Sequence, residues 1–375
     1  MGQAAKEMKR RTENEKKPDL ILLLVTLLLV TVGTVMVYSS SSILAMERFR
    51  DGQFFLKKQL FFLCLGLGVM VLVTRISYYK LRKLAWPGII LSVFFLLLIW
   101  VPHLGIRAGG AVRWLNFGLF SFQVTEMVKV ALIIFLAHFL TEKVNHIREF
   151  REGMLVPLGI MVTLVGLILL QPDFGTTFII ALITFLMIFL AGGRIVHLAG
   201  LAALFLPVAL WLLLHKSYRL ARLTAFLDPW KDPRHSGFQI IQSLISFGSG
   251  GTFGVGIGDG MQKLFYLPEP HTDFILSVIA EESGFIGVGL ILLLYIILIV
   301  RGFRISLKAP DRFGNLLAAG LTMMLALEAF INIAGVMGLI PLKGLALPFL
   351  SYGGTSLMMS LAAVGILLNI SSYES

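Results

Sequence analysis

The segment LPEPHTDFILSVIAEESGFIGVGLILLLYIILIV, residues 267–300, places a polar cluster directly before a long apolar run. The cluster includes His271 and Asp273, and Glu281 and Glu282 follow within the run itself. An apolar run of this length can cross a bilayer as a helix, which takes about 20 residues. Because ionised groups are unfavourable inside lipid, acids at such a position are candidates for a function.

The rest of the chain has a similar character and predicts an all-α polytopic membrane protein. Of its 375 residues, 57% are hydrophobic and only 14% are charged, and the mean hydropathy is +0.88. Soluble domains have about 25% charged residues. The net charge of +11 agrees with basic loops that orient a membrane protein, so we expect no nucleic-acid partner. The single cysteine, Cys64, excludes an internal disulfide.

The apolar runs predict about ten transmembrane helices in one membrane domain, residues 20–372. A basic cytoplasmic tail, residues 1–19, precedes it, and residues 373–375 form a cytoplasmic end. We expect the first span to stay uncleaved, because it is longer than the apolar part of a signal peptide. The expected spans are 20–40, 55–74, 84–102, 123–141, 154–171, 174–192, 195–215, 273–300, 314–339 and 347–369.

The distribution of Lys and Arg predicts that both termini are cytoplasmic. Segments on the side of the termini carry 18 of these residues, and those on the opposite side carry 13, six of them in the long region 216–272. Long loops follow the positive-inside rule poorly, so the short loops decide the orientation. The loops 103–122 and 216–272 are then extracytoplasmic, and Asp273 lies at the outer membrane surface.

The large extracytoplasmic loop, 216–272, separates the seventh and eighth spans. Its stretch IIQSLISFG, residues 240–248, is too short to span and predicts an interfacial or re-entrant helix. The next stretch, GSGGTFGVGIGDG (248–260), is rich in glycine, which lets backbone N–H groups approach a ligand closely. It lacks the spacing and the βαβ context of a dinucleotide-binding motif.

Asp273 is the leading candidate for catalysis, and it also has a structural interpretation. If the helix begins near Thr272, a carboxylate in the first turn is stabilised by the helix dipole. The functional interpretation is a general base at the boundary between membrane and water.

Glu281 and Glu282 cannot both line one groove with Asp273. On a helix Glu281 falls near the Asp273 side and Glu282 nearly opposite. Either acid can have a structural partner inside the bundle, for which Lys129, Arg194 or a polar residue of another span are candidates, or take part in function.

Further candidates for substrate binding are spread along the chain. Glu126 and Lys129 lie three residues apart on one helix face, where they either neutralise each other or handle a charged substrate. Trp114 either anchors the chain at the interface or stacks on a sugar or headgroup, and Arg113 and Lys263 can hold a phosphate. No metal-binding motif is present. The set is completed by His271, Glu281 and, in LPFLSYGGTS (347–356), Ser351.

Five stretches in order along the chain resemble the SEDS family (shape, elongation, division and sporulation) of peptidoglycan glycosyltransferases. They are RWL…FQ…E..K, QPDFGTT, LDPW.DP…G.Q..QS, KL.YLPE.HTDFI…I.EE.GFIG and GLIP.KGL.LPF.SYGG.S, between residues 105 and 369. The stretch IPLKGLALP, with Lys343, is more similar to the division branch, FtsW, than to the elongation branch, RodA. A sporulation-type relative would look similar.

The resemblance implies an enzyme that polymerises lipid II, an undecaprenyl-pyrophosphate-linked disaccharide-pentapeptide, at the outer face of the bacterial cytoplasmic membrane. The family's essential aspartate falls on Asp273, which implies that this residue is the general base. Either a divalent cation, Mg²⁺ or Mn²⁺, or the basic residues Arg113, Lys129 and Lys263 would balance the charge of the leaving pyrophosphate. A class B penicillin-binding protein, a transpeptidase, is the implied partner, together with other divisome proteins at the septum.

Two other functions are compatible with the sequence. A lipid II flippase accounts equally well for Glu126, Lys129 and the glycine-rich last span, but it needs no carboxylate at the outer surface. A scaffold without catalytic activity would only recruit the transpeptidase. Substitution of Asp273 distinguishes the three, because only the enzyme requires a base there.

Overall fold

The computed structural model describes residues 17–108, 111–116, 118, 120–214, 223–235, 237–263, 267, 269–342 and 344–373. Most of the predicted tail, residues 374–375 and the branch-specific Lys343 lie outside the described residues. The expectations that rest on them stay predictions.

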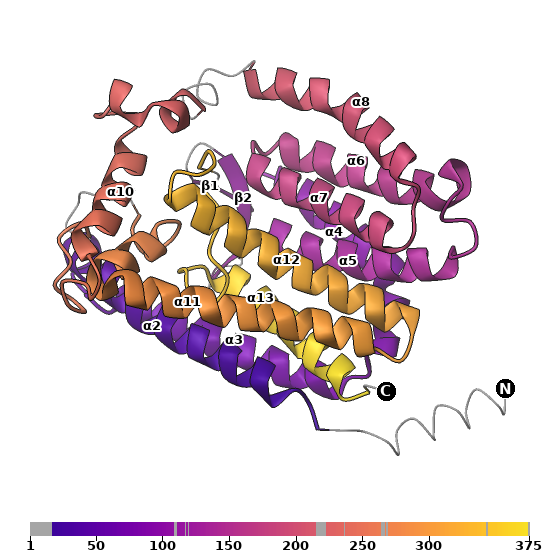
Figure 1. The fold of residues 1–375 in the computed structure, drawn as a ribbon, viewed down its shortest axis with the longest axis horizontal. Helices are drawn as coiled ribbons and strands as arrows, with labels where there is room; N and C mark the ends of the chain where they lie inside the picture. Colours follow the sequence, from indigo (N-terminus) through magenta and orange to yellow (C-terminus); the bar gives the residue numbers. More distant parts are fainter. Residues whose placement is uncertain are drawn as a thin grey trace.

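The described chain is a bundle of helices with one small sheet (Figure 1). Eight of the described helices are long and apolar enough to cross a membrane, and two further apolar helices, Phe174–Leu190 and Ile195–Pro207, are shorter. Each of the ten predicted spans overlaps one of these helices, which confirms the all-α polytopic fold. The helices are α2 (Leu20–Phe49), α3 (Phe54–Arg75), η1 (Tyr78–Leu84), α4 (Ala85–Leu98), α5 (Val124–Glu142), η2 (Phe150–Met154), α6 (Leu155–Leu169), α7 (Phe174–Leu190), α8 (Ile195–Leu214), η3 (Pro229–Lys231), α10 (Phe238–Gly250), α11 (Ile275–Lys308), α12 (Arg312–Val336) and α13 (Gly354–Ser371).

Aspartate side chains determine where some of these helices begin. Asp19 accepts a hydrogen bond from the N–H of Leu22 at 3.0 Å at the start of α2. Asp311 accepts one from the N–H of Gly314 at 3.2 Å at the start of α12. Each carboxylate satisfies an N–H group that has no partner within the helix and lies at the positive end of its dipole.

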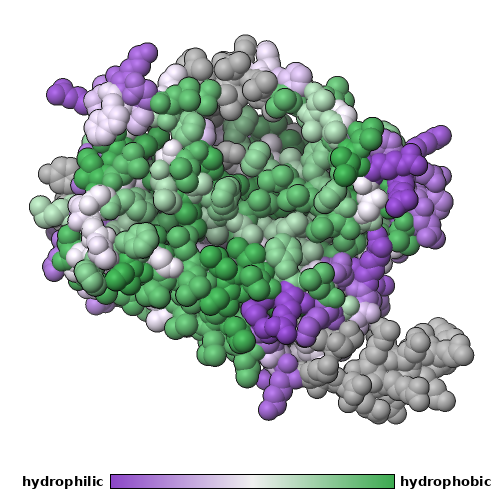
Figure 2. Space-filling view, in the orientation of Figure 1, coloured by the Kyte–Doolittle hydropathy of each residue, from purple (hydrophilic) through white to green (hydrophobic). Residues whose placement is uncertain are grey.

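Helices α5, α12 and α13 form the centre of the bundle, since most of their side chains are buried. Helix α13 packs against α3, and α12 packs against α11 and α5. Helices α3 and α4 bury few side chains and expose many Leu, Ile and Phe side chains. Figure 2 shows a broad apolar surface over the bundle, which is suited to contact with lipid rather than water.

The small sheet was not predicted from the sequence. It has the order β1–β2–β3, with β1 (Gly105–Ala108), β2 (Ala111–Asn116) and β3 (Ser121–Gln123), and both pairings are antiparallel. Strands this short give no clear alternation in the sequence. The sheet occupies the expected loop 103–122 and leads directly into α5.

Two sets of side-chain contacts define the two ends of the bundle. At one end Arg301 donates from Nε to Asp19 at 2.8 Å, and the Tyr78 hydroxyl donates to Asp311 at 2.7 Å. These residues come from the segments that the Lys/Arg distribution places on the side of the termini. We call this the Asp19 end.

The other end carries β1–β3, and we call it the sheet end. Here the N–H of Gln123 donates to Oγ1 of Thr355 at 3.2 Å, which joins β3 to the start of α13. The N–H of Tyr352 donates to the carbonyl of His271 at 2.8 Å. The segments around residues 103–122, 267–274 and 344–355 therefore meet at one end, as the predicted topology requires.

Candidate active site around Asp273

Asp273 lies just before α11 at the sheet end and is half-buried. The helix begins at Ile275 with Phe274 as its N-cap residue, so the expected start near Thr272 is wrong. The carbonyls of Thr272 and Asp273 accept hydrogen bonds from Ser351 and Asn332, which lie on other segments of the chain. The helix therefore begins only after them. Asp273 directly precedes the N-cap residue and so still lies near the positive end of the α11 dipole; both its structural and its functional interpretation stay predictions.

Two consecutive carbonyl groups hold the Asp273 segment in place. The hydroxyl of Ser351 donates to the carbonyl of Thr272 at 2.6 Å. The side-chain amide of Asn332, on α12, donates to the carbonyl of Asp273 at 2.9 Å and to that of Leu345 at 2.6 Å. The Asp273 backbone is thereby fixed to both α12 and the loop before α13, and a fixed backbone orients the carboxylate for a reaction.

Gly344 lies directly beside the Asp273 carboxylate. A Cβ atom at position 344 would lie 3.2 Å from Oδ2 of Asp273, and the φ of Gly344 is +64°. A side chain here would be strained and would crowd the carboxylate. The absence of a side chain therefore keeps space open next to Asp273.

His271 is buried between aromatic rings next to this segment. Its ring lies 4.4 Å from that of Phe55 and 5.4 Å from that of Tyr352, measured between centroids. Its Nε2 lies 3.6 Å from the carboxylate of Glu269. Burial lowers the pKa of His271 to about 4; the Glu269 carboxylate opposes this shift and Arg48 adds to it. The imidazole is therefore neutral at neutral pH.

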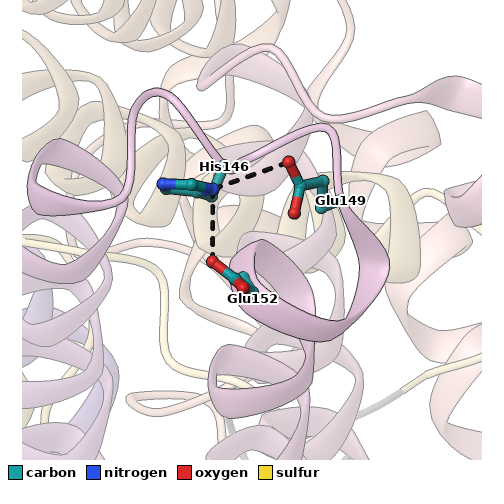
Figure 3. Close-up of side chains that lie close together, drawn as sticks. All are labelled: His146, Glu149 and Glu152. Atoms are coloured by element: carbon teal, nitrogen blue, oxygen red, sulfur yellow. Dashed lines mark ion pairs between the residues drawn. The ribbon is translucent and has the colours of Figure 1, made fainter.

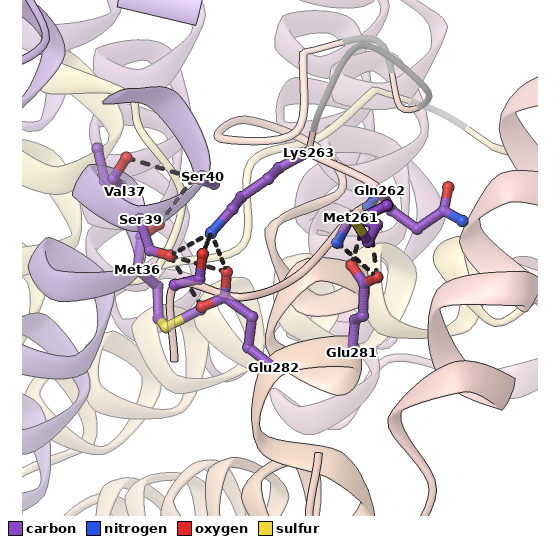
Figure 4. Close-up of polar contacts among 10 residues, drawn as sticks. Met36, Val37, Ser39, Ser40, Met261, Gln262, Lys263, Glu281 and Glu282 are labelled. Atoms are coloured by element: carbon purple, nitrogen blue, oxygen red, sulfur yellow. Dashed lines mark hydrogen bonds and ion pairs between the residues drawn. The ribbon is translucent and has the colours of Figure 1, made fainter. Parts of the chain in front are cut away.

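Glu281 binds the backbone of the glycine-rich loop, as Figure 4 shows. Its carboxylate accepts from the N–H groups of Met261 at 2.9 Å and Gln262 at 3.1 Å. The sequence had suggested Lys129, Arg194 or a polar residue of another span as its partner, and the structure corrects this for Glu281. A search of the sequence for complementary charges cannot find partners that are backbone N–H groups.

Glu282 forms a buried ion pair with Lys263 (Figure 4). The Lys263 ammonium lies 2.6 Å from Oε1 of Glu282, and it also donates to the carbonyl of Gly258 at 2.6 Å. The hydroxyl of Ser39, on α2, donates to the same carboxylate at 2.8 Å. Glu281 and Glu282 bind different groups of the same loop, and both carboxylates lie next to Gly260. The expectation from helical spacing that they face different sides is therefore wrong, and together they attach the loop to α11.

Lys129 lies in the bundle interior between two carboxylates. Its ammonium lies 2.9 Å from Glu126 and is also paired with Glu328 on α12. The sequence predicted the Glu126 partner but not Glu328. Glu328 and Asn332 are four residues apart on α12 and so share one helix face. That face connects the Lys129 cluster with Asp273.

Arg113 and Trp114 lie on strand β2. Arg113 donates to the carbonyl of Pro172 at 2.8 Å, and its Nε lies 3.8 Å from Asp173. It thus binds the turn in QPDFGTT that precedes α7. Trp114 pairs with Ile106 in the sheet and is half-buried. Whether either residue contacts a substrate stays a prediction.

One group of three exposed side chains in the described part of the chain lies close enough together to hold a metal ion, and it is remote from Asp273. His146 lies 3.5 Å from Glu149 and 3.2 Å from Glu152 (Figure 3). This group follows α5, whose 19 residues rise about 28 Å from the sheet end. Around Asp273 the described residues offer no comparable set of three ligands. A cation there would need oxygens of the substrate, as Mg²⁺ often does.

The family model FtsW/RodA/SpoVE, described as cell cycle protein, matches residues 19–375. The chain belongs to this family. Membership confirms the resemblance to the SEDS proteins and identifies a multi-pass membrane protein. Asp273, Glu281 and Ser351 all lie inside the matched region.

Relatives and solved structures agree with the family membership. A probable peptidoglycan glycosyltransferase FtsW of Trichlorobacter lovleyi is 48% identical, over 94% of this chain and 93% of the relative. The stage V sporulation protein E of Bacillus subtilis is 46% identical, over 97% and 99%. A chain of a peptidoglycan synthase complex that coordinates polymerization and crosslinking has a TM-score of 0.78 and 32% identity, over 94% and 97%. RodA of Thermus thermophilus has a TM-score of 0.68 and 27% identity, over 94% and 96%.

Three residues of this FtsW/RodA/SpoVE-family site escaped the sequence analysis, namely Glu328, Asn332 and Gly344. Glu328 and Asn332 are polar residues four apart in an otherwise apolar span, which is a recognisable signal for a shared polar face. Gly344 has no such signal, because its role depends on a positive φ and on the proximity of Asp273.

Proposed function

We propose that this chain is a peptidoglycan glycosyltransferase that polymerises lipid II into glycan strands. The observation that carries the proposal is the placement of Asp273: a half-buried carboxylate at the sheet end, with its backbone held by Asn332 and with Gly344 beside it. The relatives named as probable peptidoglycan glycosyltransferases support the same activity.

In the proposed reaction Asp273 acts as the general base. The 4-hydroxyl of the acceptor sugar attacks the anomeric carbon of the donor, and its proton moves to the Asp273 carboxylate. The new C–O bond forms as the bond to undecaprenyl pyrophosphate breaks, and the pyrophosphate leaves with the electron pair. A single displacement inverts the configuration at the anomeric carbon.

The leaving pyrophosphate needs positive charge nearby. Lys129 and Lys263 are buried in ion pairs, whereas Arg113, although its Nε lies 3.8 Å from Asp173, is partly exposed. Arg113 or a divalent cation is therefore the proposed source of this charge. If Mg²⁺ or Mn²⁺ took part, Asp273 would help to hold it, and the ion would supply positive charge for the leaving pyrophosphate. Arg113 keeps part of its side chain exposed at the sheet end.

We further propose that the sheet end faces the outside and that both termini are cytoplasmic. The short-loop excess of Lys and Arg at the Asp19 end supports this orientation.

A class B penicillin-binding protein is the proposed partner, supported by the likeness to a chain of a synthase complex that couples polymerization to crosslinking. The relatives named FtsW support a site of action at the division septum with other divisome proteins.

The test is lipid II polymerisation by the purified protein with its cognate transpeptidase. Asp273→Asn keeps size and hydrogen bonding but removes the base, and it should abolish glycan strands while the complex persists. Asp259→Asn, a change of an exposed acid in the glycine-rich loop, is the matched control and should keep activity. If Asp273→Asn still forms polymer, the proposal fails. Lipid II flipping is measured with the same variants in lipid vesicles. A flippase would keep this transport activity when Asp273 is changed to Asn.

A further inference from the structure

The glycine-rich loop after α10 belongs to a long stretch without charge. From residue 236 to residue 258 the sequence contains no Asp, Glu, Lys, Arg or His. Helix α10 covers the first half, and the chain then turns back through Gly251, Gly254, Gly256 and Gly258, all with positive φ. An uncharged segment that enters and returns on one side has the pattern of a re-entrant element.

The loop is inserted into a break in α11. The φ of Gly284 is +64°, which interrupts the helix. The carbonyls of Glu281 and Glu282 accept instead from the N–H groups of Val255 at 3.0 Å and Gly256 at 3.1 Å. The loop therefore satisfies helix carbonyls that the break leaves without their usual partners.

The N–H groups after the break are satisfied in the same way. Phe285 donates to the carbonyl of Gly251 at 2.9 Å, and Ile286 donates to that of Thr252 at 3.2 Å. With four backbone bonds across it, the break meets the condition for irregular backbone at membrane depth, namely that its polar groups bond within the protein.

The position of this break along α11 places the loop at the level of lipid. Arg301 pairs with Asp19 and marks the Asp19 end of the apolar part of the helix. A hydrocarbon core of about 30 Å corresponds to about 20 helical residues, which reach from Arg301 to Glu281. Gly284 and the loop bound to it thus lie just inside the opposite boundary of the core.

Four side chains of the loop face outward and are apolar, and the exposed Asp259 lies between the last two of them in the chain. Phe253 is 80% exposed and Ile257 is 69% exposed, and Val255 and Met261 are also exposed. We call these four residues the loop patch. It continues into Phe285, which is 76% exposed, and into the outward stripe of α11 that comprises Ile286, Leu290, Leu293, Ile296 and Val300. Figure 2 shows the apolar surface reaching the end of the molecule where α10 lies in Figure 1.

We propose that acyl chains of the outer leaflet cover the loop patch, so that the loop is anchored in the bilayer. The four patch side chains are uncharged, they continue the outward stripe of α11, and the loop backbone is bonded to α11 as membrane depth requires. The exposed Asp259 between Ile257 and Met261 then lies at the headgroup boundary. Lipid contact thereby presses the loop against the turn of α11 that carries Glu281 and Glu282. This inference does not depend on the proposed enzymatic activity.

Site-directed fluorescence quenching tests the proposal in the full chain. The single cysteine is replaced by Cys64→Ser, and Phe253→Cys or Ile257→Cys carries a bimane label in phosphatidylethanolamine–phosphatidylglycerol vesicles. Leu290→Cys is the lipid-facing control and Arg234→Cys the exposed loop control. Thermal unfolding confirms that each variant is folded. If Phe253→Cys does not fold, Ile257→Cys is used in its place.

The expected result is that lipids brominated on the acyl chains quench the loop labels as strongly as the Leu290 label. Iodide in the water should quench the loop labels about tenfold less than the Arg234 label, because an anion is excluded from hydrocarbon. Iodide quenching equal to that at Arg234 would overturn the proposal and leave the patch for a protein partner. Protection from both quenchers would also overturn it, because another copy of the chain would then cover the patch.

Discussion

Asn332 and Asp273 are joined by a hydrogen bond of 2.9 Å from the side-chain amide of Asn332 to the backbone carbonyl of Asp273. Glu328, one helical turn before Asn332, is paired with Lys129 on α5. One face of α12 thus connects the buried charges of the bundle with the candidate base. The position of Asp273 depends on α12 as well as on its own segment.

Asn332→Ala should lower lipid II polymerisation more than its effect on stability explains. We expect a loss of about 10- to 100-fold, because a small displacement of a catalytic group has an effect of that size. The loss should appear in kcat, measured by the rate of glycan strand formation at saturating lipid II.

Asn315→Ala is the matched control, because Asn315 donates from the same atom type to the Ser306 carbonyl at 2.8 Å at the Asp19 end of α12. Both variants should lower the free energy of unfolding by about 1–3 kcal/mol. Equal losses of activity in the two variants would mean that Asn332 acts only through stability.

Gly344→Ala should lower activity by crowding Asp273. The new Cβ would lie 3.2 Å from Oδ2 of Asp273. Gly338→Ala is the control, because its φ is +69° but its Cβ would lie 3.7 Å from a methyl group of Ile240. Both changes cost about 1–2 kcal/mol for the left-handed backbone, so their melting temperatures should fall alike. If the two variants also polymerise lipid II at the same rate, Gly344 has no part in the site.

Removing one partner of the Lys263–Glu282 pair should destabilise the fold more than removing both partners. Its side chains are 4% and 0% exposed. Glu282→Met or Lys263→Met alone should destabilise the fold by about 3–5 kcal/mol, because one buried charge is left without a partner. The double variant Lys263→Met/Glu282→Met should recover much of this loss, as measured by thermal unfolding in micelles.

The exposed pair of Lys57 with Asp51 is the comparison, at 2.8 Å with side chains 61% and 40% exposed. Lys57→Met should change the melting temperature little, because solvent screens such a pair. If the losses of stability in the two single variants simply add up in the double variant, Lys263 and Glu282 do not stabilise the fold as a pair.

Acidification should destabilise the fold through His271. Burial lowers its native pKa from 6.5 to about 4, so the unfolded state binds a proton in this range while the native state does not. Stability should therefore fall as the pH drops from about 6.5 to about 4, by on the order of 3 kcal/mol at most. The melting temperature across this range measures the effect.

His271→Gln should flatten this pH dependence, because the group that titrates is removed. His235→Gln is the control, since the His235 side chain is 84% exposed in the same extramembrane region. An unchanged pH dependence in His271→Gln would assign the acid sensitivity to other groups.

The sequence by itself predicted the ten spans and their grouping into two ends, and its resemblance to the SEDS family singled out Asp273. Hydropathy and the Lys/Arg distribution are local properties, and the bilayer imposes them directly on each segment. The expected Glu126–Lys129 pair also followed, because residues three apart on a helix must be neighbours.

Only the tertiary structure decided the partners of the remaining polar groups. Lys129 meets Glu328, and Ser39 meets Glu282, across about two hundred residues of chain or more. Asn332 reaches the Asp273 carbonyl, and Glu281 binds loop N–H groups that have no signature in the sequence. Buried polar groups must find partners wherever packing brings them, and that packing depends on the whole bundle.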